Sequence, residues 1–385
     1  MVQSFLHIVA QNLVKKFGTA LDQLVIVFPN KRASLFLNEE FVSIAQEQND
    51  TPFWAPEYQT IGDLFESLSP YTTADPIVSI CRLYDIYKQH IGESDCEPID
   101  KFYSWGEVML SDFNEIDKQM VEADSLFRYA EDWNELSDTG AFLEDDQIDI
   151  LKHYFKDFSI ENLQYEKERF LQLWKKLPFI YKDFKQCLKE NGILYDGALC
   201  RDVVEHERYK HLNQQKIYVF VGFNILSPVQ FSLLRSIKEE GKALFYWDYD
   251  PTQNTPGLNK LIYDTCSYID SYKSVLPNAL TSDELKSSTA NQAPEIDFIR
   301  TNTTNAQSRY VPQWLKSVGL EQNTAVILAD ESLLPQVLHT LPDTTVNITM
   351  GYALADTPIL GIITTLTDLV VNGKAGATVE APKDK

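Results

Sequence analysis

Paired cysteines are missing from this sequence. Its five cysteines, at positions 81, 96, 187, 200 and 266, form no C-x-x-C pair, and their number is odd. Structural zinc sites are usually built from such pairs, and a disulfide framework uses an even number of cysteines. The six histidines are scattered along the chain and show no metal-ligand spacing. We therefore expect no metal site, no disulfide framework, and a reducing compartment such as the cytoplasm.

Long apolar runs are missing as well. No stretch of the sequence approaches the roughly 18 apolar residues that a membrane-spanning helix needs. The chain starts with the residues MVQS, which lack the basic segment of a signal peptide. These observations predict a cytoplasmic protein without a membrane partner.

Positive charge is scarce. The 385 residues include 34 lysines and arginines against 56 aspartates and glutamates, a formal net charge of -22. Proteins that coat duplex DNA are normally basic, because they neutralise phosphates over a broad surface. An acidic surface mainly favours solubility, and it is also compatible with a protein-binding role. Any nucleic-acid contact must therefore use a local basic corner or be shared with a partner.

The motifs that hold a nucleoside triphosphate are also absent. The sequence contains no Gly-Lys-Ser or Gly-Lys-Thr, with which a P-loop ends. The apolar run at 217–221 is followed by Gly222, Phe223 and Asn224, where an acidic pair for magnesium would stand. Because nothing matches the charges of magnesium and nucleotide, we predict that this chain does not hydrolyse ATP and holds no catalytic residues.

Two groups of carboxylates remain as candidate metal ligands or acid–base pairs. Asp248 and Asp250 end an apolar run, and Asp112, Glu115 and Asp117 lie in a segment with helical periodicity. A plainer interpretation fits each group better. The first is a solvated strand end, and the second is a solvated or intra-domain polar face.

The most informative stretch that is present covers residues 24–37, LVIVFPNKRASLFL. Five apolar residues, mostly β-branched or aromatic, predict a strand at 24–28 that is buried on both faces, as in a parallel sheet. Pro29 cannot donate to a ladder and ends the strand. Asn30 is typical of a helix N-cap. The apolar face of the helix that follows is expected at Leu35, Phe36 and Phe41.

A candidate phosphate site lies at the end of this strand. Ligands of open α/β sheets collect at the carboxyl ends of the strands. Here Asn30, Lys31 and Arg32 join the free N–H groups of a helix N-terminus. The alternative is a solvated helix start, although cations at that end oppose the helix dipole.

Residues 53–68 add three candidate contacts. An extended piece with Trp54 and Tyr58 is predicted to enter a helix capped at Thr60. Thr60 would lie at the strand-end side of the first unit, and the two aromatic rings are candidates for stacking on bases. Core packing is the alternative for both rings.

The order of predicted elements gives an α/β fold class with two units. The first unit covers 1–76 and 213–250, and an all-helical insertion covers 77–212, with helices that include 145–158 and 166–189. Residues 251–292 are a linker or insertion. A second, incomplete unit covers 293–372, with strands at 296–299, 324–328 and 346–349, each followed by a helix. Residues 373–385 are expected to be a disordered tail.

This layout resembles a superfamily 1 helicase motor, in which two RecA-like parallel-sheet units are joined and the first is interrupted by helices. An ordered set of short motifs narrows the resemblance to the amino-terminal part of AddB-type subunits of AddAB/RecBCD-class helicase–nucleases. The motifs are VFPNKRA (27–33), WAP (54–56), TIGDLF (60–65), SWG (104–106), DFNEID (112–117), VGFN (221–224), LSP (226–228), FYWD (245–248), AVILADE (325–331), NITMGY (347–352) and TP (357–358).

The resemblance implies a role in the repair of DNA double-strand breaks. Such a subunit contacts single-stranded DNA or a duplex end, and its partner is an AddA-type motor subunit. A PD-(D/E)XK nuclease domain, which uses magnesium, would follow beyond residue 385, so we expect that the sequence is a piece of a longer protein. No cofactor is expected for the residues present.

Two other functions stay open. The chain is an active ATP-dependent DNA helicase if its nucleotide site is unusual. It is a purely protein-binding scaffold if the acidic surface excludes DNA altogether.

Overall fold

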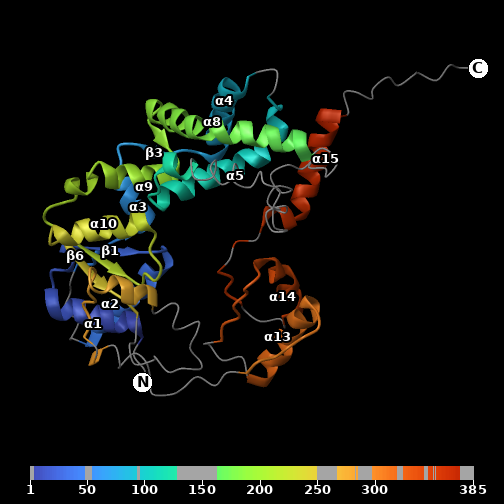
Figure 1. Ribbon diagram of the computed structural model, residues 1–385. Coiled ribbons are helices and arrows are strands. Elements are labelled where there is room, and N and C mark those ends of the chain that lie inside the picture. The colour runs from blue at the N-terminus through green and yellow to red at the C-terminus, as the bar shows by residue number, and fades with distance from the viewer. Residues whose placement is uncertain are drawn as a thin grey trace, which may run out of the picture. The chain divides into compact units, whose positions relative to one another are not determined.

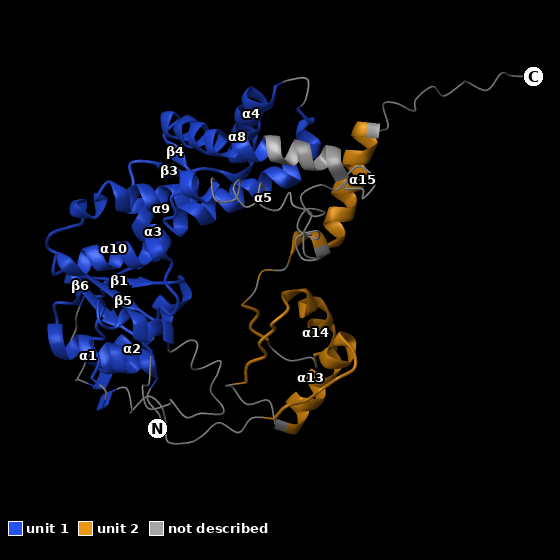
Figure 2. Ribbon diagram, in the orientation of Figure 1, with its two compact units in different colours: residues 1–293 blue, residues 294–385 orange. Residues whose placement is uncertain are grey.

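A computed structural model describes residues 4–47, 54–92, 96–127, 163–248, 267–281, 283–284, 297–318, 324–341, 346–349, 351 and 353–372. The chain divides into two compact units, residues 1–293 and residues 294–385 (Figure 2).

Unit 1 contains a four-stranded sheet in the order β2-β1-β5-β6. The strands are β1 (Leu24–Phe28), β2 (Glu57–Thr60), β5 (Ile217–Val221) and β6 (Ala243–Tyr246). All three neighbouring pairs are parallel. The prediction of an α/β fold with a parallel sheet is confirmed, and the predicted strand at 24–28 is β1, whose five residues are all buried.

Helices cover both faces of this sheet (Figure 1). The helices are α1 (Phe5–Phe17), α2 (Arg32–Glu47), α3 (Ile61–Leu68) and α10 (Pro228–Glu239). Helices α1 and α2 pack on the face that contains Ile26 and Phe28. Helices α3 and α10 pack on the face that contains Val25 and Val27. Successive side chains of a strand point to opposite faces, so a strand buried between two helix layers must be apolar throughout.

The apolar face predicted for the helix after β1 is partly wrong. Helix α2 buries Leu37, Phe41 and Ile44 against the sheet. Leu35 and Phe36, by contrast, are 65% and 54% exposed. The buried residues follow an i, i+4, i+7 spacing, and that phase turns Leu35 and Phe36 toward solvent.

The helical insertion is built from four described helices, α4 (Pro76–Ile91), α5 (Ile99–Lys118), α8 (Leu163–Glu190) and α9 (Asp196–Glu205). The prediction that strands are absent from 77–212 is wrong, because β4 (Ile193–Leu194) pairs in parallel with β3 (Thr72–Thr73). A strand of two residues is too short to show the alternation of apolar and polar residues by which strands are recognised in a sequence. The helix predicted at 145–158 lies outside the described residues.

Part of the segment predicted as a linker or insertion, residues 251–292, belongs to unit 1 and packs beside β6. Asn278 makes a parallel bridge with Phe245 of β6. The indole Nε1 of Trp247 donates to the carbonyl oxygen of Leu276 at 2.9 Å. Short 3-10 helices at η1 (Leu21–Gln23) and η3 (Arg208–His211) also belong to this unit.

Unit 2 contains the three predicted helices, as α13 (Thr304–Val318), α14 (Leu334–Thr340) and α15 (Pro358–Asn372), with 3-10 helices η5 (Glu331–Leu333) and η6 (Leu354–Asp356). The three predicted strands are wrong for the residues that the structure describes, 297–299, 324–328 and 346–349, which belong to no strand. A strand needs a hydrogen-bonded neighbour, and a run of β-branched residues does not supply one. The predicted tail, 373–385, lies outside the described residues.

Candidate nucleic-acid interface

The loops after the four parallel strands meet at one edge of the sheet in unit 1. Phe28 of β1 is in register with Thr60 of β2. On the other side, Val27 is in register with Phe220 of β5. Asn30 and Asn224, which follow β1 and β5, therefore belong to the same carboxyl edge.

The chain leaves this edge in two directions. From β1 it continues into α2 on one face of the sheet, and from the neighbouring β5 it continues into α10 on the opposite face. The strand order thus reverses between β1 and β5, which is the position where open α/β sheets bind their ligands. Gly222 begins the second loop with a φ of 73°, a left-handed conformation that favours glycine.

Asn30 caps α2 as predicted. Its side-chain Oδ1 accepts a hydrogen bond from the backbone N–H of Ala33 at 3.2 Å. The hydroxyl of Ser34 donates to the carbonyl oxygen of Lys31 at 2.7 Å, which ties down the same turn. The backbone of this loop is therefore held from both sides, while its charged side chains remain exposed.

Lys31 and Thr60 are joined through Asp63. The ammonium of Lys31 lies 3.9 Å from a carboxylate oxygen of Asp63, and the two side chains are 82% and 42% exposed. The backbone N–H of Thr60 donates to Asp63 at 3.0 Å, and the N–H of Asp63 donates to the Thr60 hydroxyl at 3.1 Å. These hydrogen bonds, with Lys31 nearby, lower the pKa of Asp63. The main role of Thr60 here is therefore to cap α3 in a capping box.

Arg32 is the first residue of α2 and is exposed. It belongs to the same loop end as Lys31. The structure therefore gathers Asn30, Lys31, Arg32 and Thr60 at one edge of the sheet, as the sequence predicted from the position of the strand ends.

The two aromatic candidates are placed differently. Tyr58 lies within β2, where its ring stacks on Phe28 with 6.4 Å between centroids and its hydroxyl donates to Asn38 of α2 at 3.4 Å. Burial raises its pKa to about 12. Trp54 precedes β2 and is 79% exposed. Because β1 and β2 are parallel, Trp54 lies on the amino side of the sheet, away from Asn30.

Of the three candidate carboxylates in the helical insertion, Asp112 and Glu115 are exposed, and Asp117 lies in a buried polar cluster. Asp117 is fully buried, and it accepts hydrogen bonds from the hydroxyls of Tyr181 and Tyr195, both at 2.5 Å. Lys185 and Arg201 approach the same carboxylate at 2.8 and 3.5 Å. The cluster ties α5, α8 and α9 together, which agrees with the intra-domain interpretation. Its burial was hidden in the sequence because the partners lie 64 to 84 residues away.

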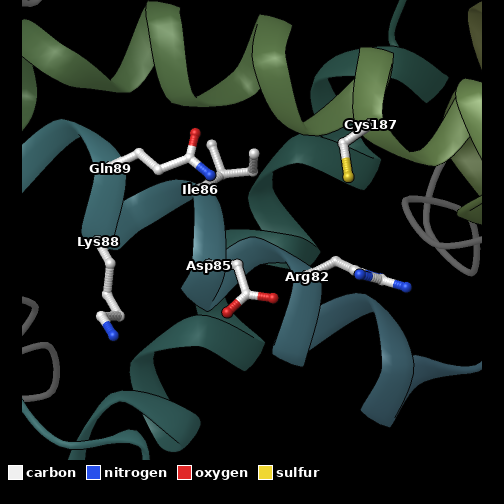
Figure 3. A pocket seen from close by; sticks show the side chains of 6 residues that line it. All are labelled: Arg82, Asp85, Ile86, Lys88, Gln89 and Cys187. Carbon is white, nitrogen blue, oxygen red and sulfur yellow. The ribbon is translucent and has the colours of Figure 1, made fainter.

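A pocket of about 390 Å³ lies between α4 and α8, with Cys187 of α8 across from the α4 side chains (Figure 3). The lining residues are Arg82, Asp85, Ile86, Lys88, Gln89 and Cys187. Charges of both signs line it, so it favours no anion or cation. It belongs to the helical insertion and shares no residue with the carboxyl edge of the sheet.

Within the described ranges, no group of three His, Cys, Asp or Glu side chains is placed to hold a metal ion. In the same part of the chain, no helix combines the length and the apolar character needed to cross a membrane. Asp248, the described member of the second carboxylate pair, is exposed after β6, and Asp250 lies outside the described residues.

Comparison with models of protein families finds no match, and a search among curated proteins finds none either. The resemblance to AddB-type subunits therefore stays a prediction that depends on the motifs of the chain itself.

Proposed function

We propose that this chain is a non-catalytic, helicase-like module of a nuclease complex that repairs DNA double-strand breaks, and that it holds single-stranded DNA at the carboxyl edge of its sheet. The observation that carries the proposal is the grouping of Asn30, Lys31 and Arg32 at the point where the strand order reverses. The sequence offers no P-loop beside it, so the ligand that fits is a phosphate backbone without a bound nucleotide.

The charges at this edge suit a phosphate. Lys31 is held only by a long and exposed ion pair with Asp63, and exposed pairs of this kind contribute about 0–1 kcal/mol. A DNA phosphate can replace the Asp63 carboxylate at little cost. In a chain with a formal charge of -22, two adjacent exposed cations after a buried strand form a local basic corner.

We also propose the finer fold assignment, two RecA-like units of which the second is incomplete. The alternation of helices with apolar segments in the sequence of unit 2 supports it. The partner would then be an AddA-type motor subunit, and a magnesium-dependent PD-(D/E)XK nuclease domain would belong to the same protein outside this sequence.

Binding of single-stranded oligonucleotides by the full chain across a salt series tests the proposal. In the Lys31→Ala/Arg32→Ala variant we expect weaker binding and a smaller salt dependence. Each lost phosphate contact makes the slope of log K against log salt shallower by about 0.7. The control is Lys210→Ala/Arg235→Ala, which removes two exposed cations that are paired with Glu207 and Glu239. Equal slopes for wild type and the first variant would contradict the proposal, as would tight magnesium-dependent binding of ATP.

A protein-binding scaffold is the second candidate. It is favoured by the exposed apolar side chains of α15, among them Ile362, Leu366 and Leu369, which are 56–66% exposed. Tight capture of a motor subunit together with no measurable DNA binding would select this function.

A further inference from the structure

The outward face of α2 carries large apolar side chains directly beside the basic corner. Leu35 and Phe36 are 65% and 54% exposed. Arg32 precedes them by three and four residues, a spacing that places all three side chains on one face of a helix, with about 5–6 Å between Cβ atoms. A cation and an aromatic ring therefore share one face of the first two turns of α2.

These two side chains do not serve the core of unit 1. Helix α2 is anchored through Leu37, Phe41 and Ile44, which are 0–3% exposed. Leu35 and Phe36 contribute little to the contact between α2 and the sheet, and more than half of each side chain is exposed to solvent. An apolar surface next to cations suits a ligand that has both an apolar and an anionic part.

The patch lies at the edge where the proposed DNA site is. Helix α2 starts two residues after Asn30, so its first turns flank the loop that follows β1. Ile225, in the loop that follows the neighbouring β5, is also exposed, at 62%. Farther along α2 the exposed residues include Glu39, which repels phosphates and confines an anionic ligand to the first turns.

We infer that Phe36, with Leu35 beside it, is the platform on which an unpaired base of single-stranded DNA stacks while Lys31 and Arg32 contact the adjoining phosphates. The occupant follows from charge complementarity, because two cations border the apolar patch. Every base has an aromatic face, so the contact accepts any sequence but requires an unpaired base. This inference rests on the proposed function and replaces Trp54 and Tyr58 as the stacking residues.

The test compares two probes on the full chain: oligo-dT and an abasic oligonucleotide of the same length. For wild type we expect tighter binding of oligo-dT. Phe36→Ala should weaken oligo-dT binding about tenfold, since stacking on an aromatic side chain accounts for an effect of that order. Its binding of the abasic probe should not change. Phe36→Trp should retain the preference for oligo-dT, and Trp54→Ala should behave as wild type.

The outcomes separate this inference from the proposed function. If wild type binds neither probe, the proposed function is wrong, and the inference is wrong with it. If Lys31→Ala/Arg32→Ala weakens binding but Phe36→Ala binds oligo-dT as wild type does, only the stacking inference is wrong. Equal weakening of both probes by Phe36→Ala would indicate a structural effect and would also contradict stacking. A partner protein that loses affinity for Phe36→Ala while oligo-dT does not would identify a protein docking face instead.

Discussion

The predicted strands of unit 1 and unit 2 are alike in sequence but differ in their surroundings. Ile26 of β1 and Val219 of β5 are completely buried, with a paired strand on each side and helices on both faces. In unit 2, Phe298 and Ile327 are 93% and 90% exposed and belong to no strand. β-Branched and aromatic residues favour a strand, whereas the pairing and burial of that strand depend on neighbours elsewhere in the chain.

The largest expected effect on the free energy of unfolding comes from alanine substitutions in predicted strands. One substitution is in unit 1, at Phe220, and one is in unit 2, at Ile327. Phe220 is 1% exposed, and its ring stacks on Phe245 with 5.4 Å between centroids. Phe220→Ala should lower the free energy of unfolding by about 3–5 kcal/mol, because it leaves a cavity in the core. Ile327→Ala should change it by less than about 0.5 kcal/mol, because its side chain is exposed.

Urea denaturation followed by circular dichroism measures both variants. A loss of more than about 2 kcal/mol in Ile327→Ala would show that this side chain is buried in solution. That result would remove the contrast between the units and would support a paired sheet in unit 2.

Alkaline pH should act on unit 1 through its buried tyrosines. Burial is the main cause that raises the pKa of Tyr181 and Tyr195 above the ordinary value, and the neighbouring Asp117 raises them further. Burial also raises the pKa of Tyr58 to about 12. The folded state then holds these protons more tightly than the unfolded state. Stability is unaffected below the unfolded pKa of about 10 and decreases as the pH rises above it.

Denaturation at a series of pH values from 8 to 11 measures this dependence. The Tyr195→Phe variant, which keeps the ring but cannot ionise, should show a weaker decrease above pH 10 than wild type. An unchanged free energy of unfolding across the series would contradict the buried position of these hydroxyls.

The smallest effect is expected at the cap of α3. Thr60→Ala removes the side-chain acceptor for the N–H of Asp63 and should lower the free energy of unfolding by about 1 kcal/mol. Thr60→Ser keeps the hydroxyl and should cost less. Thermal unfolding of the three proteins ranks them, and a Thr60→Ala protein as stable as wild type would show that the capping box adds nothing to unit 1.

Local sequence signals predicted much of unit 1. The apolar run before Pro29 predicted β1, Asn30 predicted the cap of α2, and Thr60 predicted the start of α3. Strand termination and helix capping each involve only a few neighbouring residues, so both partners of the interaction can be recognised in the local sequence. The grouping of Asn30 and Thr60 was also predictable, because parallel strands share a carboxyl edge.

Contacts between distant residues were not predictable in the same way. Leu35 and Phe36 were assigned to the interior, because the sequence does not state which side of α2 meets the sheet. Trp54 was a candidate for the same DNA site as Asn30, although it precedes β2, which runs parallel to β1, and therefore lies at the opposite edge of the sheet. The burial of Asp117 depends on two tyrosines that other helices supply.

The sequence by itself determined β1, the caps of α2 and α3, the two cations that follow β1, and the absence of a P-loop motif from the sequence. Only the tertiary structure decided which side chains of α2 face water and which tyrosines surround Asp117. It also decided that the strand order reverses between β1 and β5. The physical reason is range: capping and periodicity act within a few residues, whereas burial and strand pairing require partners from distant parts of the chain.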